Sequence, residues 1–257
     1  MHHKVDIEKR FDGVIRLYGK ESFERFCQAH ICVIGMGGVG SWAVEAFARH
    51  GIGYLTLIDP DKVVESNMNR QIQAIQSNLG IPKIMALANR IREINPECKV
   101  KTIQKFILPT DDLKELLFQN RFDYVVDAID TVGTKAGIIA YCRGKKIPLV
   151  TIGGAGGQID PTKIEIADLS KTEQEPLLAK VRKKLRAQHG FLRGTRNKFG
   201  IDAIYSKEPL RYAKSLSKDD SAHEEDDLSM GFGTSVTVTA SFGMVAAALV
   251  LRRLAKI

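Results

Sequence analysis

Hydrophobic and polar stretches alternate regularly through residues 31–152, and they predict strands that alternate with helices. Short apolar runs indicate buried strands, and the amphipathic stretches between them indicate helices. The predicted strands are residues 31–35, 54–59, 98–103, 122–127 and 147–152. The predicted helices are residues 39–50, 82–94, 110–118 and 133–143. Strands and helices that alternate at this spacing imply a mostly parallel, doubly wound sheet.

The pattern changes after residue 157. A run at 162–168 predicts a strand that runs back, and residues 201–206 predict another short strand. Residues 207–229 are polar and predict a loop. The predicted fold class is therefore α/β, a Rossmann-like, mainly parallel sheet with additional antiparallel strands in the C-terminal part.

We expect one domain over residues 1–257, with three special regions. These are an N-terminal helical segment (1–30), a substrate-facing region (158–230) and a closing helix (231–257). Residues 228–251 carry no charge and are long enough to span a bilayer, but they are rich in Gly, Ser and Thr. A buried helix that closes the sheet is the prediction, and membrane association is the alternative. The charged N-terminal segment has no apolar core of a secretory signal, which favours the cytoplasm.

Several glycines directly follow the first predicted strand. They are Gly35, Gly37, Gly38 and Gly40. Glycine allows a sharp turn and the close approach of a phosphate, and the free N–H groups of a helix N-terminus bind anions. Asp59 ends the second strand about 20 residues later, where a carboxylate can hydrogen-bond ribose hydroxyls. These features alone predict a nucleotide site and most often accompany NAD or FAD.

The polar residues that follow favour a triphosphate over a dinucleotide. Arg70 and Lys83 offer a planar cationic fork and a compact charge, which suit the β- and γ-phosphates. Asp127 and Asp130 end the fourth strand, and a carboxylate there can hold Mg²⁺ shared with phosphate. ATP with Mg²⁺ is therefore the predicted ligand, and a redox module using NAD stays an alternative.

At these residues the chain resembles the ThiF/MoeB adenylyltransferases of the ubiquitin-activating-enzyme-like superfamily. The motifs are G35-MGGVG, D59, N67-MNRQ, K83 and D127-AID, and the resemblance covers residues 10 to about 157 plus the closing helix. It implies an adenylating enzyme that acts as a homodimer.

The resemblance also implies roles for single residues. Asp59 would bind the ribose, Asn67, Arg70 and Lys83 the phosphates, Gln71 would support that loop, Asp127 would line the nucleotide site, and Asp130 would hold Mg²⁺. The superfamily takes one arginine from its N-terminal segment, often across a dimer interface. Here Gly13 stands at that position, and Arg16 is the nearest substitute.

Net charge and cysteine content indicate which class of substrate the chain acts on. The net charge is +8, which favours an acidic partner such as nucleic acid. The basic side chains at 180–198 are Lys180, Arg182, Lys183, Lys184, Arg186, Arg193, Arg196 and Lys198. No C-x-x-C pair is present, so we expect no zinc. No cysteine follows Cys142, which argues against a thioester with a ubiquitin-like protein.

Further motifs resemble the superfamily branch that dehydrates N6-threonylcarbamoyladenosine in tRNA. They are R16-LYG, N67-MNRQ, Y141-CR and I147-PLVTIGGAGGQIDPT, together with the basic stretch. The branch implies ATP-dependent adenylation of the threonyl carboxylate, then attack by the neighbouring carbamoyl group and loss of AMP. The basic stretch would then bind tRNA phosphates.

Other interpretations and partners stay open. The chain could instead activate the C-terminal glycine of a small sulfur-carrier protein. A monovalent cation is a candidate second ion, and a cysteine desulfurase or sulfur-acceptor system is a candidate partner.

Overall fold

The computed structural model describes residues 6–107, 121–194, 197–212 and 232–257. Its centre is a seven-stranded sheet in the order β3-β2-β1-β4-β5-β7-β6. The strands are β1 (His30–Ile34), β2 (Tyr54–Ile58), β3 (Lys99–Ile103), β4 (Tyr124–Asp127), β5 (Leu149–Ile152), β6 (Ile164–Asp168) and β7 (Asp202–Ser206). The predicted doubly wound, mainly parallel sheet is confirmed.

One detail of the C-terminal part differs from expectation. Among the strands that the structure describes, the β6–β7 pair alone is antiparallel, and β7 pairs with β5 in parallel. A parallel partner for β5 requires a crossover, and the helix after β6 provides it. The described part of region 158–230 thus extends the main sheet, and its contact with substrate stays a prediction.

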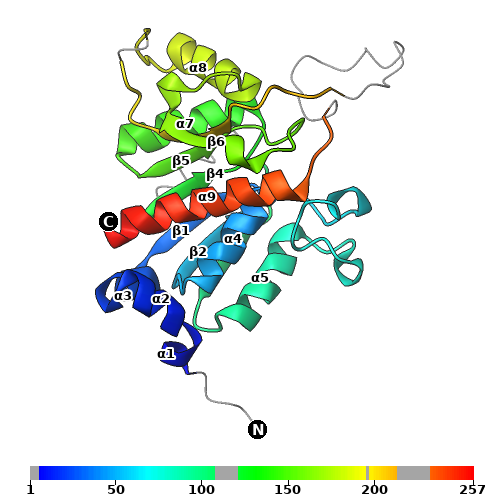
Figure 1. Cartoon of the computed structure of the whole chain (residues 1–257), viewed down its shortest axis with the longest axis vertical. Helices are drawn as coiled ribbons and strands as arrows, with labels where there is room; N and C mark the ends of the chain where they lie inside the picture. Colours follow the sequence, from blue (N-terminus) through cyan, green and yellow to red (C-terminus); the bar gives the residue numbers. More distant parts are fainter. Residues whose placement is uncertain (1–5, 108–120, 195–196, 213–231) are drawn as a thin grey trace.

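Helices cover both faces of the sheet (Figure 1). Apolar side chains of α3 (Lys20–Gln28), α4 (Gly40–Arg49), α5 (Lys83–Ile94) and α9 (Val236–Ala255) share one core cluster. Side chains of α7 (Val132–Lys145) and α8 (Pro176–Gln188) share a second cluster. The short helices α1 (Ile7–Arg10) and α2 (Asp12–Tyr18) precede α3. The described ranges also contain the 3₁₀ turns η1 (Glu65–Asn67), η2 (Gln76–Asn78), η3 (Pro161–Lys163) and η4 (Leu169–Lys171). The predicted helix 110–118 lies outside the described residues.

The strand order reverses between β1 and β4, and this creates the crevice where ligands of such sheets bind. Both β2 and β4 flank β1, and the register sets Ile34 beside Ile58 and Asp127. The loop after β1, Asp59 after β2 and the turn after β4 therefore meet at one edge.

Helix α9 crosses one face of the sheet beside α4 (Figure 1). A Cβ at Gly243 would lie 2.5 Å from the carbonyl oxygen of Val39, so glycine allows α9 to approach the start of α4 closely. By length and composition alone α9 could span a membrane, yet 56% of its most apolar window is buried. Burial of this kind is typical of the core helix of a globular protein.

Candidate nucleotide-binding site

The glycine loop after β1 is packed tightly on its inner side and open on its outer side. Gly35 has φ +92°, and a Cβ there would lie 2.8 Å from the carbonyl oxygen of Ala128. A Cβ at Gly40 would lie 1.8 Å from the carbonyl oxygen of Gly35, whereas a Cβ at Gly37 would meet nothing within 4 Å. Helix α4 starts at Gly40 without a side-chain cap, so its first N–H groups suit a phosphate.

Asp59 joins this loop to the end of β2. Its Oδ2 accepts a hydrogen bond from the backbone N–H of Met36 (2.6 Å), and its Oδ1 accepts one from Asp61 (2.9 Å). Burial raises the pKa of Asp59, and the nearby Lys83 ammonium opposes that rise. Each oxygen keeps a second lone pair, so the carboxylate can hold the loop and still accept from a ribose hydroxyl.

The segment after η1 folds back against the glycine loop and carries Arg70. The carbonyl oxygen of Asn67 accepts from the N–H groups of Arg70 (3.1 Å) and Gln71 (3.0 Å). The Trp42 indole of α4 donates to the carbonyl oxygen of Arg70 (2.9 Å). A Cβ at Gly38 would lie 3.1 Å from Cγ of Arg70, so the Arg70 side chain passes directly over the loop. Arg70 thus lies beside the glycine loop, and its contact with phosphate stays a prediction.

Sequence reasoning missed Gln73, which is almost fully buried beneath this segment. Its Nε2 donates to the carbonyl oxygen of Met36 (2.8 Å) and to Oε1 of Gln71 (3.0 Å). Gln73 thereby ties the glycine loop to the 67–71 segment. A glutamine in a polar stretch carries no signal of burial, and only the fold shows it.

Lys83 is buried at the start of α5 and already has an acidic partner. Its Nζ lies 2.7 Å from Oδ2 of Asp61, whose side chain is 54% exposed. Because that carboxylate is half in water, a phosphate oxygen could replace it at modest cost. Lys83 can therefore serve as the predicted phosphate contact, with a phosphate oxygen in the place that Asp61 takes here.

The two acidic residues at the end of β4 lie in different environments. Asp127 is fully buried, and its Oδ2 lies 3.0 Å from Nζ of Lys135 and accepts from the Thr151 hydroxyl (2.7 Å). Burial raises the pKa of Asp127, and Lys135 opposes the rise. This carboxylate is occupied inside the protein, so the structure gives Asp127 a supporting role in place of the predicted nucleotide contact.

Asp130 is exposed, and its carboxylate has no hydrogen bond or ion pair with the residues that the structure describes. Nowhere in the described ranges do three or more His, Cys, Asp or Glu side chains gather in a way that could hold a metal. A single exposed carboxylate such as Asp130 fits Mg²⁺, which is commonly bound by one or two carboxylates together with waters and substrate phosphates.

The basic stretch lies mainly on α8, at the edge of the α7–α8 layer (Figure 1). Its exposed members are Lys183, Arg193 and Lys198, and its half-buried members are Lys180, Arg182, Lys184 and Arg186. Arg196 lies outside the described residues. Glu175 caps the start of α8 and accepts from the N–H of Gly154 (3.0 Å), so the helix begins beside the strand-end loops.

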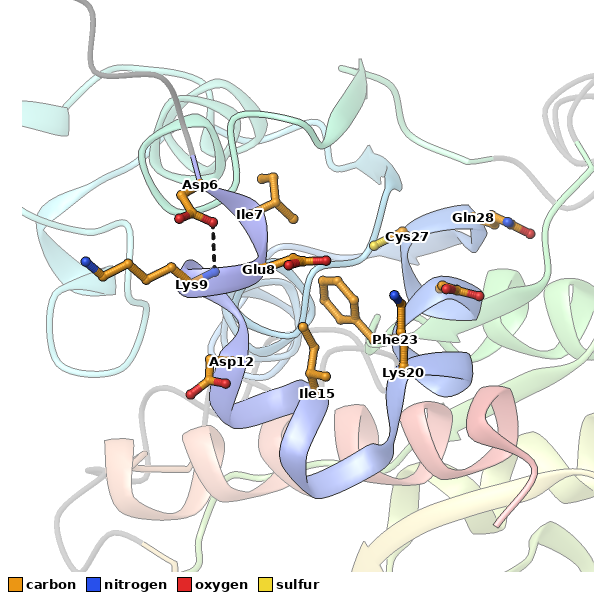
Figure 2. A pocket seen from close by; sticks show the side chains of 11 residues that line it. Asp6, Ile7, Glu8, Lys9, Asp12, Ile15, Lys20, Phe23, Cys27 and Gln28 are labelled. Carbon is orange, nitrogen blue, oxygen red and sulfur yellow. Dashed lines mark hydrogen bonds between the residues drawn. The ribbon is translucent and has the colours of Figure 1, made fainter.

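Arg16 does not join the site within one chain. Its guanidinium pairs with Asp12 at 2.8 Å and its side chain is 79% exposed. Helix α2 lies next to α3, which leads into the start of β1, whereas the glycine loop follows the end of β1. A groove of about 870 Å³ is formed among α1, α2 and α3 by residues such as Asp12, Lys20 and Phe23 (Figure 2), and it too belongs to this remote edge.

Comparison with known proteins identifies the family of the chain. The sequence profile of the ThiF family matches residues 12–257. The tRNA threonylcarbamoyladenosine dehydratase of Escherichia coli K12 is 47% identical over 252 residues, which cover 96% of this chain and 93% of that protein. The Haemophilus influenzae protein of the same name is 50% identical over 250 residues, which cover 97% and 94%. The crystal structure of the E. coli dehydratase in complex with ATP superposes with a TM-score of 0.86 and covers 96% of this chain and 94% of that one.

Proposed function

Because the chain belongs to the ThiF family and, within it, to the tRNA threonylcarbamoyladenosine dehydratases, we propose that it cyclises N6-threonylcarbamoyladenosine in tRNA with ATP. It is an ATP-dependent, tRNA-modifying enzyme. The observation that carries the proposal is the ATP-bound relative of 47% identity, whose fold this chain shares over nearly its whole length.

The reaction has two steps. An oxygen of the threonyl carboxylate attacks the α-phosphorus of ATP, and pyrophosphate leaves. The carbamoyl group of the same modified base then attacks the activated carbonyl, and AMP leaves with the carboxylate oxygen. Because the nucleophile is part of the substrate and already close to its target, the second step needs no enzyme nucleophile.

The residues at the edge of the sheet where the strand order reverses, called here the switch-point edge, have different roles in these two steps. The N–H groups at the start of α4 bind phosphate, and Asp59 binds the ribose. Arg70, Asn67 and Lys83 contact the polyphosphate, Gln71 supports their loop, and their positive charges stabilise the departing pyrophosphate. Mg²⁺, held by Asp130 and phosphate oxygens, would supply further charge neutralisation.

The substrate tRNA lies along α8. This helix begins beside Gly154 and carries exposed and half-exposed cations along its length. Contacts of lysine and arginine with phosphates position a nucleic acid without reading its sequence. The modified base itself, unstacked from its loop, enters the switch-point edge.

A homodimer completes the proposed enzyme. Arg16 lies on α2, which leads through α3 into the start of β1, whereas the glycine loop follows the end of β1, so we expect it to serve the nucleotide site of another copy of the chain. A monovalent cation, a sulfur-transfer partner and a cytoplasmic location stay predictions.

ATP–pyrophosphate exchange tests the function. Exchange should require tRNA that carries threonylcarbamoyladenosine, and unmodified tRNA should not support it. Mass spectrometry of tRNA nucleosides should show a product one water lighter than the substrate. Exchange driven instead by a small protein ending in Gly-Gly would replace this function with sulfur-carrier activation, and tight NAD(H) binding without exchange would replace it with redox chemistry.

A further inference from the structure

Lys135 is a charged residue that the reaction described above leaves without a role. It lies in the first turns of α7, and its side chain is fully buried. Its Nζ donates to the backbone carbonyl oxygens of Ile129 (2.9 Å) and Asp127 (3.3 Å), and it lies 3.0 Å from Oδ2 of Asp127. The turn that leads from β4 to α7 therefore wraps around one ammonium group.

Burial of an ammonium group carries a large desolvation penalty, which only hydrogen-bonding and charged partners can offset. The carbonyl groups of Asp127 and Ile129 both point at Nζ, away from solvent. An apolar side chain at position 135 would leave these oxygens without this donor and Asp127 without its counter-charge. Lys135 thus determines the path of the turn as well as the charge balance of the interior.

The same turn forms a wall of the nucleotide site. The N–H of Ala128 donates to the carbonyl oxygen of Ile34 (2.9 Å), and the carbonyl oxygen of Ala128 faces Gly35, where a Cβ would come within 2.8 Å. Asp130 follows Ile129 directly and is exposed. The position of the Asp130 carboxylate therefore depends on the backbone that Lys135 grips.

We propose that Lys135 is a positioning residue for adenylation, which holds the 127–130 turn so that Asp130 presents its carboxylate to the metal and the polyphosphate. The inference rests on the proposed function. It separates two effects of the Lys135 ammonium, neutralisation of Asp127 and orientation of Asp130, and these effects can be measured independently.

The test removes both buried charges together. Lys135→Met alone leaves Asp127 buried without its partner and should lower the melting temperature strongly, because an uncompensated charge then stays in the interior. Lys135→Met combined with Asp127→Asn removes the unpaired charge and should recover most of that stability. The double variant should still bind Mn²⁺ about 10–100-fold more weakly in the presence of ATP, as measured by electron paramagnetic resonance.

Turnover supplies the second readout. In the double variant, kcat for exchange should fall about 10–100-fold, with little change in the dissociation constant of metal-free ATP. Wild-type Mn²⁺ affinity and kcat in a stable double variant would show that Lys135 is only a counter-charge, and would overturn the inference. If the apolar pair does not fold, Lys135→Ala with Asp127→Asn also removes the ammonium donor and is judged by the same readouts. Lys135→Gln with Asp127→Asn keeps a donor at position 135, so it should recover Mn²⁺ affinity and kcat relative to these two variants.

Asp130→Asn, measured in parallel, separates this inference from the proposed function. Weaker Mn²⁺ binding in Asp130→Asn, with unchanged binding in the double variant, would overturn only the positioning role of Lys135. Unchanged Mn²⁺ binding and turnover in Asp130→Asn would overturn both the metal assignment and the inference. Loss of tRNA-dependent exchange in the wild-type enzyme is the separate result that overturns the function.

Discussion

Replacement of Arg70 by alanine tests the phosphate site most directly. The Nη1 of Arg70 donates to the carbonyl oxygen of Ser66 (2.7 Å) and to Oδ1 of Asn69 (2.9 Å). Two of the five guanidinium N–H groups are thereby used, and three remain to face a phosphate. The side chain already passes over Gly38, so it needs little rearrangement to reach a nucleotide.

The expected loss follows from this geometry. Removal of one preorganised donor to a developing negative charge lowers kcat by about 10²–10³, or about 3–4 kcal/mol of transition-state stabilisation. Arg70→Lys keeps the charge but loses the planar fork, so its kcat should lie between those of the wild type and Arg70→Ala. The melting temperature should change by no more than about 2 °C, because Trp42 donates to the backbone carbonyl of residue 70, which alanine retains.

The assay is ATP–pyrophosphate exchange with tRNA bearing threonylcarbamoyladenosine, combined with thermal melting. Arg92→Ala is the matched control, since Arg92 is an exposed arginine in the last turn of α5 that donates to Asn89. That control should exchange at the wild-type rate. A folded Arg70→Ala enzyme with a kcat within threefold of the wild type would refute the assignment of Arg70 to the polyphosphate.

Three further outcomes are expected. Lys183→Glu should weaken tRNA binding and reduce the slope of log Kd against log salt concentration by about one ion, as measured by filter binding. An unchanged slope would show that α8 is not part of the tRNA-binding surface. Gly40→Ala should weaken ATP binding more than tenfold in calorimetry and lower the melting temperature, because its Cβ would lie 1.8 Å from the carbonyl oxygen of Gly35; near-normal ATP affinity would contradict the packed loop. Burial alone would raise the pKa of Glu45, but hydrogen bonds from Arg90 and Arg49 hold it below the ordinary value, so this stabilisation is present above the unfolded pKa of about 4.3 and is lost as pH falls through the folded pKa. The melting-temperature deficit of Glu45→Gln at pH 7 should therefore shrink towards pH 3, and a deficit that is constant with pH would count against this ion pair.

The sheet could be predicted from sequence because parallel strands buried on both faces are short apolar runs between helices. The expected strand at 54–59 and the expected helix at 82–94 agree with β2 and α5 to within one residue at each end. The expected helix at 133–143 is α7, which extends to Lys145. The location of the glycine loop, Asp59 and Arg70 at one edge follows from the same topology.

The orientation of side chains at strand ends could not be predicted in the same way. A strand buried on both faces has no alternation of polar and apolar residues, so nothing in the sequence tells which side Asp127 takes. Its partner Lys135 lies on the next helix and resembles an ordinary solvated lysine. Gln73 is hidden for a similar reason, since one of its hydrogen bonds goes to the backbone of the glycine loop, which is distant in sequence.

The basic stretch shows a different limit of prediction from sequence, because its charge pattern does not reveal which of its side chains pack against the protein. Its charges suggest a uniform surface over 180–198, but α8 ends at Gln188. Beyond it, Phe191 and Phe199 pack against each other with ring centroids 4.8 Å apart, and the guanidinium of Arg186 lies over the Phe199 ring. Arg186 thus contributes to packing as well as to charge, and a substitution there would not isolate tRNA binding.

The state of the cysteines connects the structure to the chemistry of the second step. Cys32, Cys98 and Cys142 are buried, and burial raises the pKa of Cys98 and of Cys142 to about 12. Cys27 lies on α3 near the start of β1, remote from the glycine loop, and its pKa is also raised. A thiol attacks an acyl-adenylate as the thiolate, which these environments disfavour. The burial of three thiols and the remote position of Cys27 therefore disfavour interception of the adenylate, which supports the proposal that the carbamoyl group of the substrate is the nucleophile.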